Sequence, residues 1–107
     1  LIQHKLPVKI VVLNNGTLGF VEMEMKASGF LDVGVDLKNP NFAAMAEAFG
    51  VKGISCRDKK DVPKVVDQML SHPGPVVVDF FVEPNEHVYP MVPAGKGLHE
   101  MELGTLA

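Results

Sequence analysis

The segment from Val8 to Leu13 constrains the fold most, because five of its six residues are apolar. Such a run predicts a strand that is buried on both faces, as in a parallel sheet covered by helices. The run ends directly in Asn14, Asn15 and Gly16. Since ligand sites in parallel sheets lie just beyond the carboxyl ends of the strands, we expect the chemistry of this chain at that turn.

The asparagine pair suits a cation that is shared with an anionic ligand. A carboxamide offers a neutral oxygen to a hard cation and N–H groups to an anion, so Asn14 and Asn15 are candidates for a Mg²⁺ site with a phosphate ligand. The alternative is an ordinary loop, in which asparagine and Gly16 only supply turn geometry. The short pattern alone leaves both interpretations open.

The rest of the chain alternates between helix and strand patterns. Apolar residues at helical spacing predict three helices, and two more apolar runs predict strands. The helices are expected over Leu18–Ala27, Phe42–Phe49 and Asp61–Leu70, and the strands over Val51–Cys56 and Pro75–Val82. This order predicts an α/β fold with a parallel sheet and flanking helices, arranged as three α/β/α layers.

Glycine and proline divide the chain further. Residues 30–38 are punctuated by glycine and predict a loop beside the site. Residues 1–82 hold all predicted strands and helices, whereas 83–107 are rich in proline and glycine and read as the tail of the same domain. Because the chain starts at Leu1 rather than Met, we expect it to be a fragment of a longer protein.

Composition excludes several classes of function. Ten basic and thirteen acidic residues give a net charge of −3, and the basic residues are scattered, which argues against binding to nucleic acid. No apolar run approaches the roughly 20 residues of a membrane helix. Cys56 is alone, so the chain has no intrachain disulfide.

Three ionisable residues stand out from their surroundings. Asp79 interrupts the apolar strand at 75–82, and a buried carboxylate there needs a polar partner that the sequence does not identify. His87 and His99 each adjoin a glutamate, so a metal site can be imagined. Their setting in the proline-rich tail favours surface histidines instead.

The segment from Asn14 to Phe20 resembles the second half of the thiamine-diphosphate motif, whose first half is a Gly-Asp-Gly triplet further upstream. Similar blocks follow in the same order along nearly the whole chain. They are Leu18–Ala27, Asn41–Ala43, Ala46–Ile54 and Gly74–Asp79. The chain is therefore similar to the C-terminal diphosphate-binding domain of the pyruvate oxidase, quinone-dependent pyruvate dehydrogenase and acetolactate synthase family.

This resemblance implies a set of cofactor-binding residues. The Asn15 side chain and the Thr17 backbone carbonyl would be ligands of Mg²⁺, with Asn14 shaping the turn. Gly16 and Gly19 would let the backbone approach the diphosphate, because neither carries a Cβ. The helix that opens near Leu18 would present N–H groups to the anion.

The same resemblance bears on which enzyme of the family this is. Acetolactate synthases typically carry methionine and tryptophan where this chain has Phe20 and Glu24, and the chain has no tryptophan. The resemblance therefore favours the pyruvate oxidase or quinone-dependent pyruvate dehydrogenase branch. By carry-over, Phe20 would pack between thiamine and FAD, Val21 would line the substrate pocket, and Glu24 would position pyruvate or a proton. Glu24 as a solvated helix carboxylate is the alternative.

The resemblance implies oxidative decarboxylation of pyruvate to acetate or acetyl phosphate, with thiamine diphosphate, Mg²⁺ and FAD and with a quinone or oxygen as acceptor. We expect the chain alone to be inactive, because in this family a glutamate from another domain completes the site across a subunit interface. The parent is therefore expected to be a homo-oligomer, a dimer or tetramer. One alternative is the acetolactate synthase catalytic subunit. Another is a non-catalytic cofactor-binding or assembly module.

The tail also bears on location. Residues 84–93 and 98–101 resemble the acetolactate synthase tail more than the lipid-binding tail of the quinone-linked dehydrogenases. We therefore expect a cytoplasmic protein. Peripheral association with the inner face of the membrane is the alternative, which this tail does not support.

Overall fold

The computed structural model describes residues 1–86 and 88–104. Its strands are Lys9–Asn14 (β1), Lys52–Cys56 (β2) and Val76–Phe81 (β3). Its α-helices are Gly19–Ala27 (α1), Phe42–Ala48 (α2) and Val62–Ser71 (α3), and two short 3₁₀ helices are Lys59–Asp61 (η1) and Leu98–Glu100 (η2). The predicted strands and α-helices are confirmed, with small shifts at their ends.

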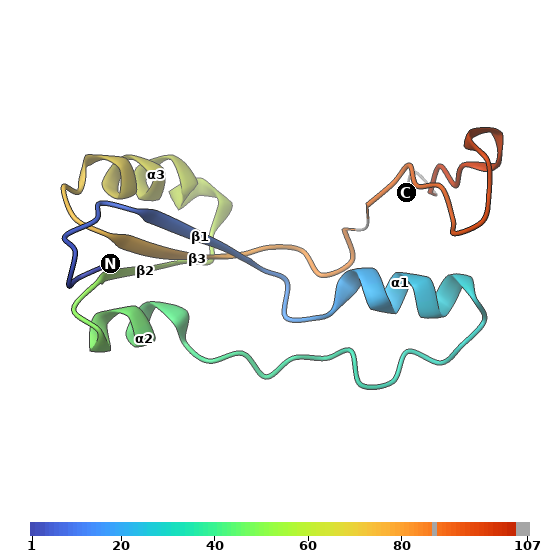
Figure 1. Ribbon diagram of the computed structural model, residues 1–107, viewed down its shortest axis with the longest axis horizontal. Helices are drawn as coiled ribbons and strands as arrows, with labels where there is room; N and C mark the ends of the chain where they lie inside the picture. Colours follow the sequence, from blue (N-terminus) through green and yellow to red (C-terminus); the bar gives the residue numbers. More distant parts are fainter. Residues whose placement is uncertain (87, 105–107) are drawn as a thin grey trace.

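The three strands form one parallel sheet in the order β1-β3-β2. Figure 1 shows α3 over one face of this sheet and α2 over the other, which confirms the predicted α/β class. Helix α1 stands apart from these layers, and the C-terminal tail runs above it (Figure 1). No helix among the described residues is long and apolar enough to cross a membrane.

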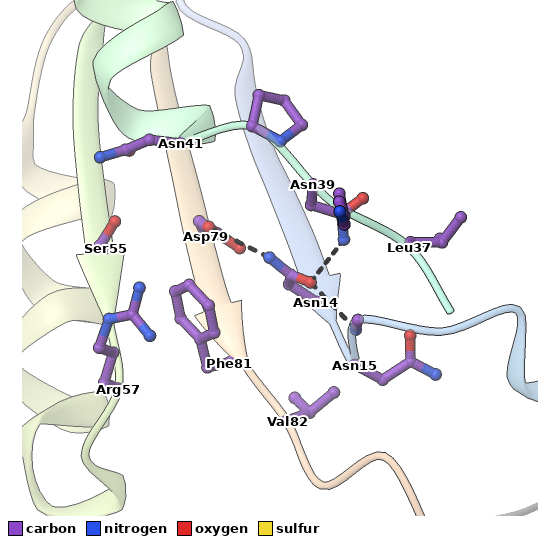
Figure 2. Close-up of a pocket in the computed structure, with 13 residues that line it drawn as sticks. Asn14, Asn15, Leu37, Asn39, Asn41, Ser55, Arg57, Asp79, Phe81 and Val82 are labelled. Atoms are coloured by element: carbon purple, nitrogen blue, oxygen red, sulfur yellow. Dashed lines mark hydrogen bonds between the residues drawn. The ribbon is translucent and has the colours of Figure 1, made fainter. Parts of the chain in front are cut away.

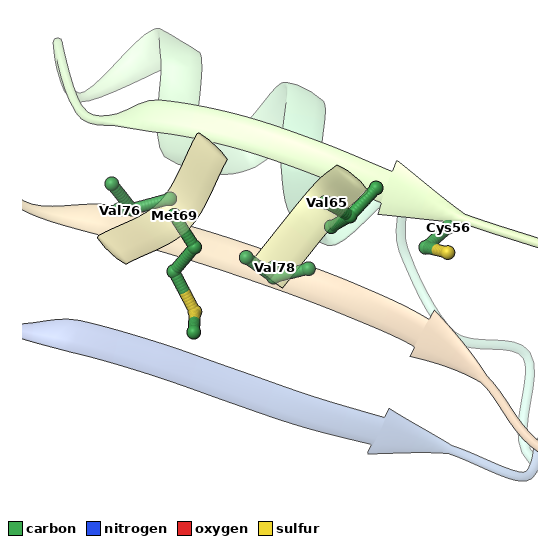
Figure 3. Packing of buried hydrophobic residues seen from close by; sticks show 5 residues of the cluster. All are labelled: Cys56, Val65, Met69, Val76 and Val78. Atoms are coloured by element: carbon green, nitrogen blue, oxygen red, sulfur yellow. The ribbon is translucent and has the colours of Figure 1, made fainter. Parts of the chain in front are cut away.

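The main core lies between the sheet and α3 (Figure 3). Val76 and Val78 of the central strand are fully buried, and Val65 and Met69 of α3 pack on them together with Cys56. Alternate residues of β3 face α3, as the two-residue period of a strand requires. Val77, Asp79 and Phe81 therefore face the α2 side of the sheet.

Helix α2 lies very close to the backbone of β2. A Cβ placed on Gly53 would lie 2.1 Å from the carbonyl oxygen of Ala43 and 2.7 Å from its carbonyl carbon. Ala43 and Ala46 are buried on this face of α2. The close approach of helix and strand therefore requires glycine at 53 and small residues on α2.

The expectation that residues 8–13 are buried on both faces is wrong. In β1, Ile10 is 40% exposed, Val11 45% and Leu13 69%. The central position belongs to β3, and no described segment covers β1 as α3 covers β3. An apolar β-branched run predicts a strand correctly but does not determine its place in the sheet, since that depends on the pairing of distant segments.

Candidate functional site

An open pocket of about 500 Å³ lies at the carboxyl ends of all three strands. Figure 2 shows its lining side chains, which come from the strand ends and from the segment that leads into α2. They include Asn14, Asn15, Gly16, Lys38, Asn39, Asn41, Ser55, Arg57, Asp79 and Phe81. The asparagine turn thus lies at the sheet edge where parallel α/β proteins bind ligands.

Two side-chain contacts build the turn after β1. The Gly16 N–H donates to Asn14 Oδ1 at 3.1 Å, and the Thr17 N–H donates to Asn15 Oδ1 at 3.2 Å. Gly16 has a φ of 71°, in the left-handed region that favours glycine. Asn14 is only 8% exposed. The Asn14 side chain therefore folds back onto the turn, and Asn15 is directed by the amide of Thr17.

The segment from Val35 to Asn39 lies along this turn and fastens it. The Leu18 N–H donates to the Val35 carbonyl and the Leu37 N–H to the Gly16 carbonyl, both at 2.9 Å. Asn39 Nδ2 donates to Asn14 Oδ1 at 2.9 Å. The Leu18 N–H is therefore occupied, and any anion at the start of α1 would be held by the amides that follow it.

The donor set at the turn fits Mg²⁺. The Asn15 carboxamide oxygen and a backbone carbonyl are neutral hard ligands, which Mg²⁺ combines with phosphate and water. The Thr17 hydroxyl donates to the Val35 carbonyl at 3.1 Å and contacts Glu22 at 3.2 Å, so the carbonyl is the oxygen of Thr17 that remains for a ligand.

The glycines of the turn leave room beside these oxygens. A Cβ on Gly16 would meet nothing within 4 Å, so the backbone there is open to a bulky ligand. A Cβ on Gly19 would lie 3.1 Å from Asn15 Nδ2, so glycine at 19 keeps space for that side chain. Both positions are compatible with a diphosphate beside the turn.

The described residues contain no group of three or more histidine, cysteine, aspartate or glutamate side chains that could hold a metal ion. His99 is highly exposed and lies 4.0 Å from Glu100. His87 is outside the described residues. The asparagine turn is therefore the metal-site candidate in the part of the chain that the structure describes.

The predicted substrate residues do not share one pocket. Phe20 is 55% exposed and lines a small pocket of about 100 Å³ with Asn15 and Val88. Glu24 lines a different pocket, of about 390 Å³, whose other residues include Lys96 of the tail. Val21 is 45% exposed on α1. The structure therefore brings Phe20 to Asn15 but not Glu24, and the roles of all three side chains stay predictions.

Several pocket residues have no role predicted from the sequence, among them Arg57, Phe81 and Asn39. The Arg57 guanidinium lies 3.6 Å from the centre of the Phe81 ring, just beyond the end of β2. Asn39 contacts Asn14, although its pattern predicts only a turn. The rule that sites follow parallel strands would have identified Arg57, since it comes directly after Cys56. Nothing local in the sequence identifies Asn39.

Glu22 supports the turn from α1, and its titration tests this contact. The hydrogen bond from Lys26 lowers the pKa of Glu22 below its usual 4.5, and the Thr17 hydroxyl lowers it further. Desolvation of the carboxyl and the negative charge of Asp32 oppose this shift without cancelling it. A carboxyl with a lowered pKa in the folded state contributes stability above pH 4.5, which is lost as the pH falls through the folded-state pKa.

We therefore expect an NMR titration of the Glu22 carboxyl carbon to give a midpoint below 4.5. Replacing Lys26 with Met should move this midpoint upward. A wild-type midpoint at or above 4.5 would show that the contact is not populated in solution.

Comparison with known proteins shows to which family the chain belongs. The family model described as thiamine pyrophosphate enzyme, C-terminal TPP binding domain, matches residues 1–80. Thiamine pyrophosphate (TPP) is another name for thiamine diphosphate. The matched region includes α1, α2 and α3, the asparagine turn and all of the sheet except Phe81, the last residue of β3.

Several acetolactate synthases resemble the chain over most of its length. The mitochondrial acetolactate synthase of Schizosaccharomyces pombe is 38% identical over 107 residues, which is 94% of this chain and 15% of that protein. Acetolactate synthase 2, chloroplastic, of Zea mays is 35% identical and covers 94% of the chain and 17% of the relative. The acetolactate synthase large subunit of Porphyra purpurea is 35% identical over 92% of the chain and 17% of the relative.

These relatives bear on the choice between the pyruvate oxidase and acetolactate synthase interpretations. The resemblance at Phe20 and Glu24 predicts the pyruvate oxidase branch, whereas the three relatives named above are acetolactate synthases and support the alternative better. The chain spans only about a sixth of the length of these relatives. On the match over residues 1–80, the chain belongs to the thiamine pyrophosphate enzymes and carries their C-terminal TPP-binding domain.

Proposed function

We propose that the full-length polypeptide is a TPP- and Mg²⁺-dependent acetolactate synthase acting on pyruvate. The observation that carries this proposal is the Asn14–Thr17 turn at the open carboxyl edge of the sheet, where Asn14, Asn15 and Gly16 line the pocket. The acetolactate synthases that resemble the chain support the choice of reaction.

In this proposal the chain binds and orients the cofactor. Asn15 and the Thr17 carbonyl hold Mg²⁺, and Gly16 leaves space for the diphosphate. When bound, TPP supplies the stabilised carbanion that permits bond cleavage next to a keto carbonyl. Phe20 lies beside Asn15 and is exposed, so it can contact the cofactor or the substrate.

A second candidate is oxidative decarboxylation of pyruvate with FAD and a quinone or oxygen acceptor. The observation in its favour is Phe20 and Glu24 at positions where acetolactate synthases typically carry methionine and tryptophan. The predicted homo-oligomer, dimer or tetramer, and the cytoplasmic location are common to both candidates and stay proposals.

The reaction products distinguish the candidates. The purified full-length protein is incubated with pyruvate, TPP, MgCl₂ and FAD, with and without a quinone or an artificial electron acceptor. We expect acetolactate to form at the same rate in both conditions, and a reaction without TPP serves as the control. Reduction of the acceptor without acetolactate would establish the oxidase instead. TPP binding without either product would favour the non-catalytic module.

A further inference from the structure

Asp79 is a buried carboxylate that the proposed reaction does not use. It is 1% exposed and lies on the central strand, opposite Val12 of β1 and Ser55 of β2. Its Oδ1 has no hydrogen-bond partner among the described residues. An incompletely paired buried carboxyl group lowers the stability of the fold, so its presence at this position calls for an explanation.

Asn14 is the side chain that hydrogen-bonds to Asp79 in the described part of the chain. Asn14 Nδ2 donates to Asp79 Oδ2 at 3.4 Å, which is a long hydrogen bond within the buried sheet edge (Figure 2). The other end of the same carboxamide, Oδ1, accepts from the Gly16 N–H and from Asn39 Nδ2. An acceptor on one side and two donors on the other permit only one orientation of the Asn14 amide.

In this orientation Asn14 Oδ1 accepts a hydrogen bond from the N–H of the adjacent Asn15–Gly16 peptide. The sequence Asn-Gly is prone to deamidation, because the Gly16 nitrogen can attack Asn15 Cγ with little steric hindrance. The attack forms a carbon–nitrogen bond and closes a succinimide. The bond from Cγ to Nδ2 breaks, ammonia leaves with the proton of the Gly16 amide, and water then opens the ring to aspartate or isoaspartate.

Two hydrogen bonds in the structure oppose this attack. The Gly16 N–H is engaged by Asn14 Oδ1 at 3.1 Å, and the Asn15 carboxamide is directed toward the Thr17 N–H at 3.2 Å. The first of these depends on the orientation of Asn14, and that orientation depends on Asp79. Loss of the Asp79 acceptor would free the Asn14 amide to rotate away from Gly16.

We propose that Asp79 is a positioning residue that acts through the Asn14 carboxamide to hold the Asn15–Gly16 turn. The turn then keeps the Asn15 oxygen directed for a cation and protects Asn15 from deamidation. The part of this inference that concerns the cation rests on the proposed function, whereas the protection from deamidation does not.

The test compares three variants of the full-length polypeptide with the wild type, and deamidation is measured before any cofactor is added. Asp79→Leu removes the acceptor at similar volume, and Asp79→Asn keeps an oxygen for Asn14 Nδ2. Val78→Ala is the matched control, because Val78 is equally buried on β3 but faces α3. Deamidation at Asn15 is followed over time by peptide mass spectrometry, and TPP binding is titrated with MgCl₂ by calorimetry.

We expect Asp79→Leu to raise the Mg²⁺ concentration for half-maximal TPP binding about tenfold, as for loss of a group that orients a metal ligand. The deamidation rate at Asn15 should rise in the same variant. Asp79→Asn should stay within about twofold of the wild type in both measurements. Val78→Ala should lower the melting temperature without changing either. An unchanged deamidation rate in Asp79→Leu, or an equal rise in Val78→Ala, would overturn the proposal.

A variant on the other side of the contact covers the case in which Asp79→Leu does not fold. Asn14→Leu removes both the acceptor for the Gly16 N–H and the donor to Asp79. The proposal expects faster deamidation at Asn15 in this variant as well, and a wild-type rate would contradict it. If the wild type shows no Mg²⁺-dependent TPP binding, the proposed function fails, while the deamidation rates still decide the role of Asp79.

Discussion

Replacing Asn15 with Ala is expected to weaken Mg²⁺-dependent TPP binding to the full-length protein about 100-fold, the upper end of losses seen when metal sites are disturbed. The variant removes one of the two oxygens assigned to the cation and leaves the fold intact, because Asn15 is only partly buried at the edge of the sheet. Asn15 Oδ1 accepts a hydrogen bond from the Thr17 N–H, and water can replace it as the acceptor.

The measurement is isothermal titration of TPP at several Mg²⁺ concentrations. Thr17→Val is the matched control, since it keeps the carbonyl that is assigned to the cation and removes only the hydroxyl. We expect this control to bind TPP with nearly wild-type dependence on Mg²⁺. Wild-type binding in Asn15→Ala would remove Asn15 from the metal site. Equal losses in both variants would indicate that the side chains matter only for the shape of the turn.

Replacing Gly53 with Ala is expected to destabilise the sheet by about 3 kcal/mol, at the upper end of the cost of overpacking a core. The added methyl group would lie 2.1 Å from the Ala43 oxygen and 2.7 Å from its carbonyl carbon, so helix α2 must move. Both obstacles are backbone atoms, and no side-chain rotation relieves the clash. We expect faster hydrogen exchange in the amides of β2 and β3, because local opening becomes less costly.

Gly74→Ala is the control for this prediction. The nearest atom to its added methyl group is Nε2 of the flexible His72 side chain, at 3.2 Å. The added methyl group of Gly74→Ala would meet only this side chain within 4 Å, so we expect the exchange rates of the variant to stay near those of the wild type. Equal protection of the β2 amides in Gly53→Ala and the wild type would show that α2 does not pack this closely in solution.

The asparagine turn illustrates what local sequence can predict. An apolar strand followed by Asn14-Asn15-Gly16 predicts a ligand site at the end of a parallel strand. The structure has a pocket at this position. The left-handed conformation of Gly16 and the two side-chain contacts of the turn are also local, since each joins residues two apart. Such features depend on a few neighbouring residues and can be read from them.

The other parts of the site depend on segments that are distant in sequence. Asn39 reaches Asn14 across 25 residues and Asp79 reaches it across 65. No periodicity or motif in the sequence predicts such long-range contacts, because they depend on how the strands pair and where the connecting segment lies. The separation of Phe20 and Glu24 into different pockets has the same origin, since it depends on where the tail meets α1.

The sequence by itself determined the strands, the helices and the turn, because hydrophobic period, helix ends and asparagine-glycine geometry are local properties of the chain. Only the tertiary structure decided that β3 is the central strand, that β1 is half exposed, and that Asp79 accepts a hydrogen bond from Asn14. The physical reason is that burial and pairing are properties of the assembled sheet. An apolar run or a single carboxylate has the same local pattern wherever the sheet places it.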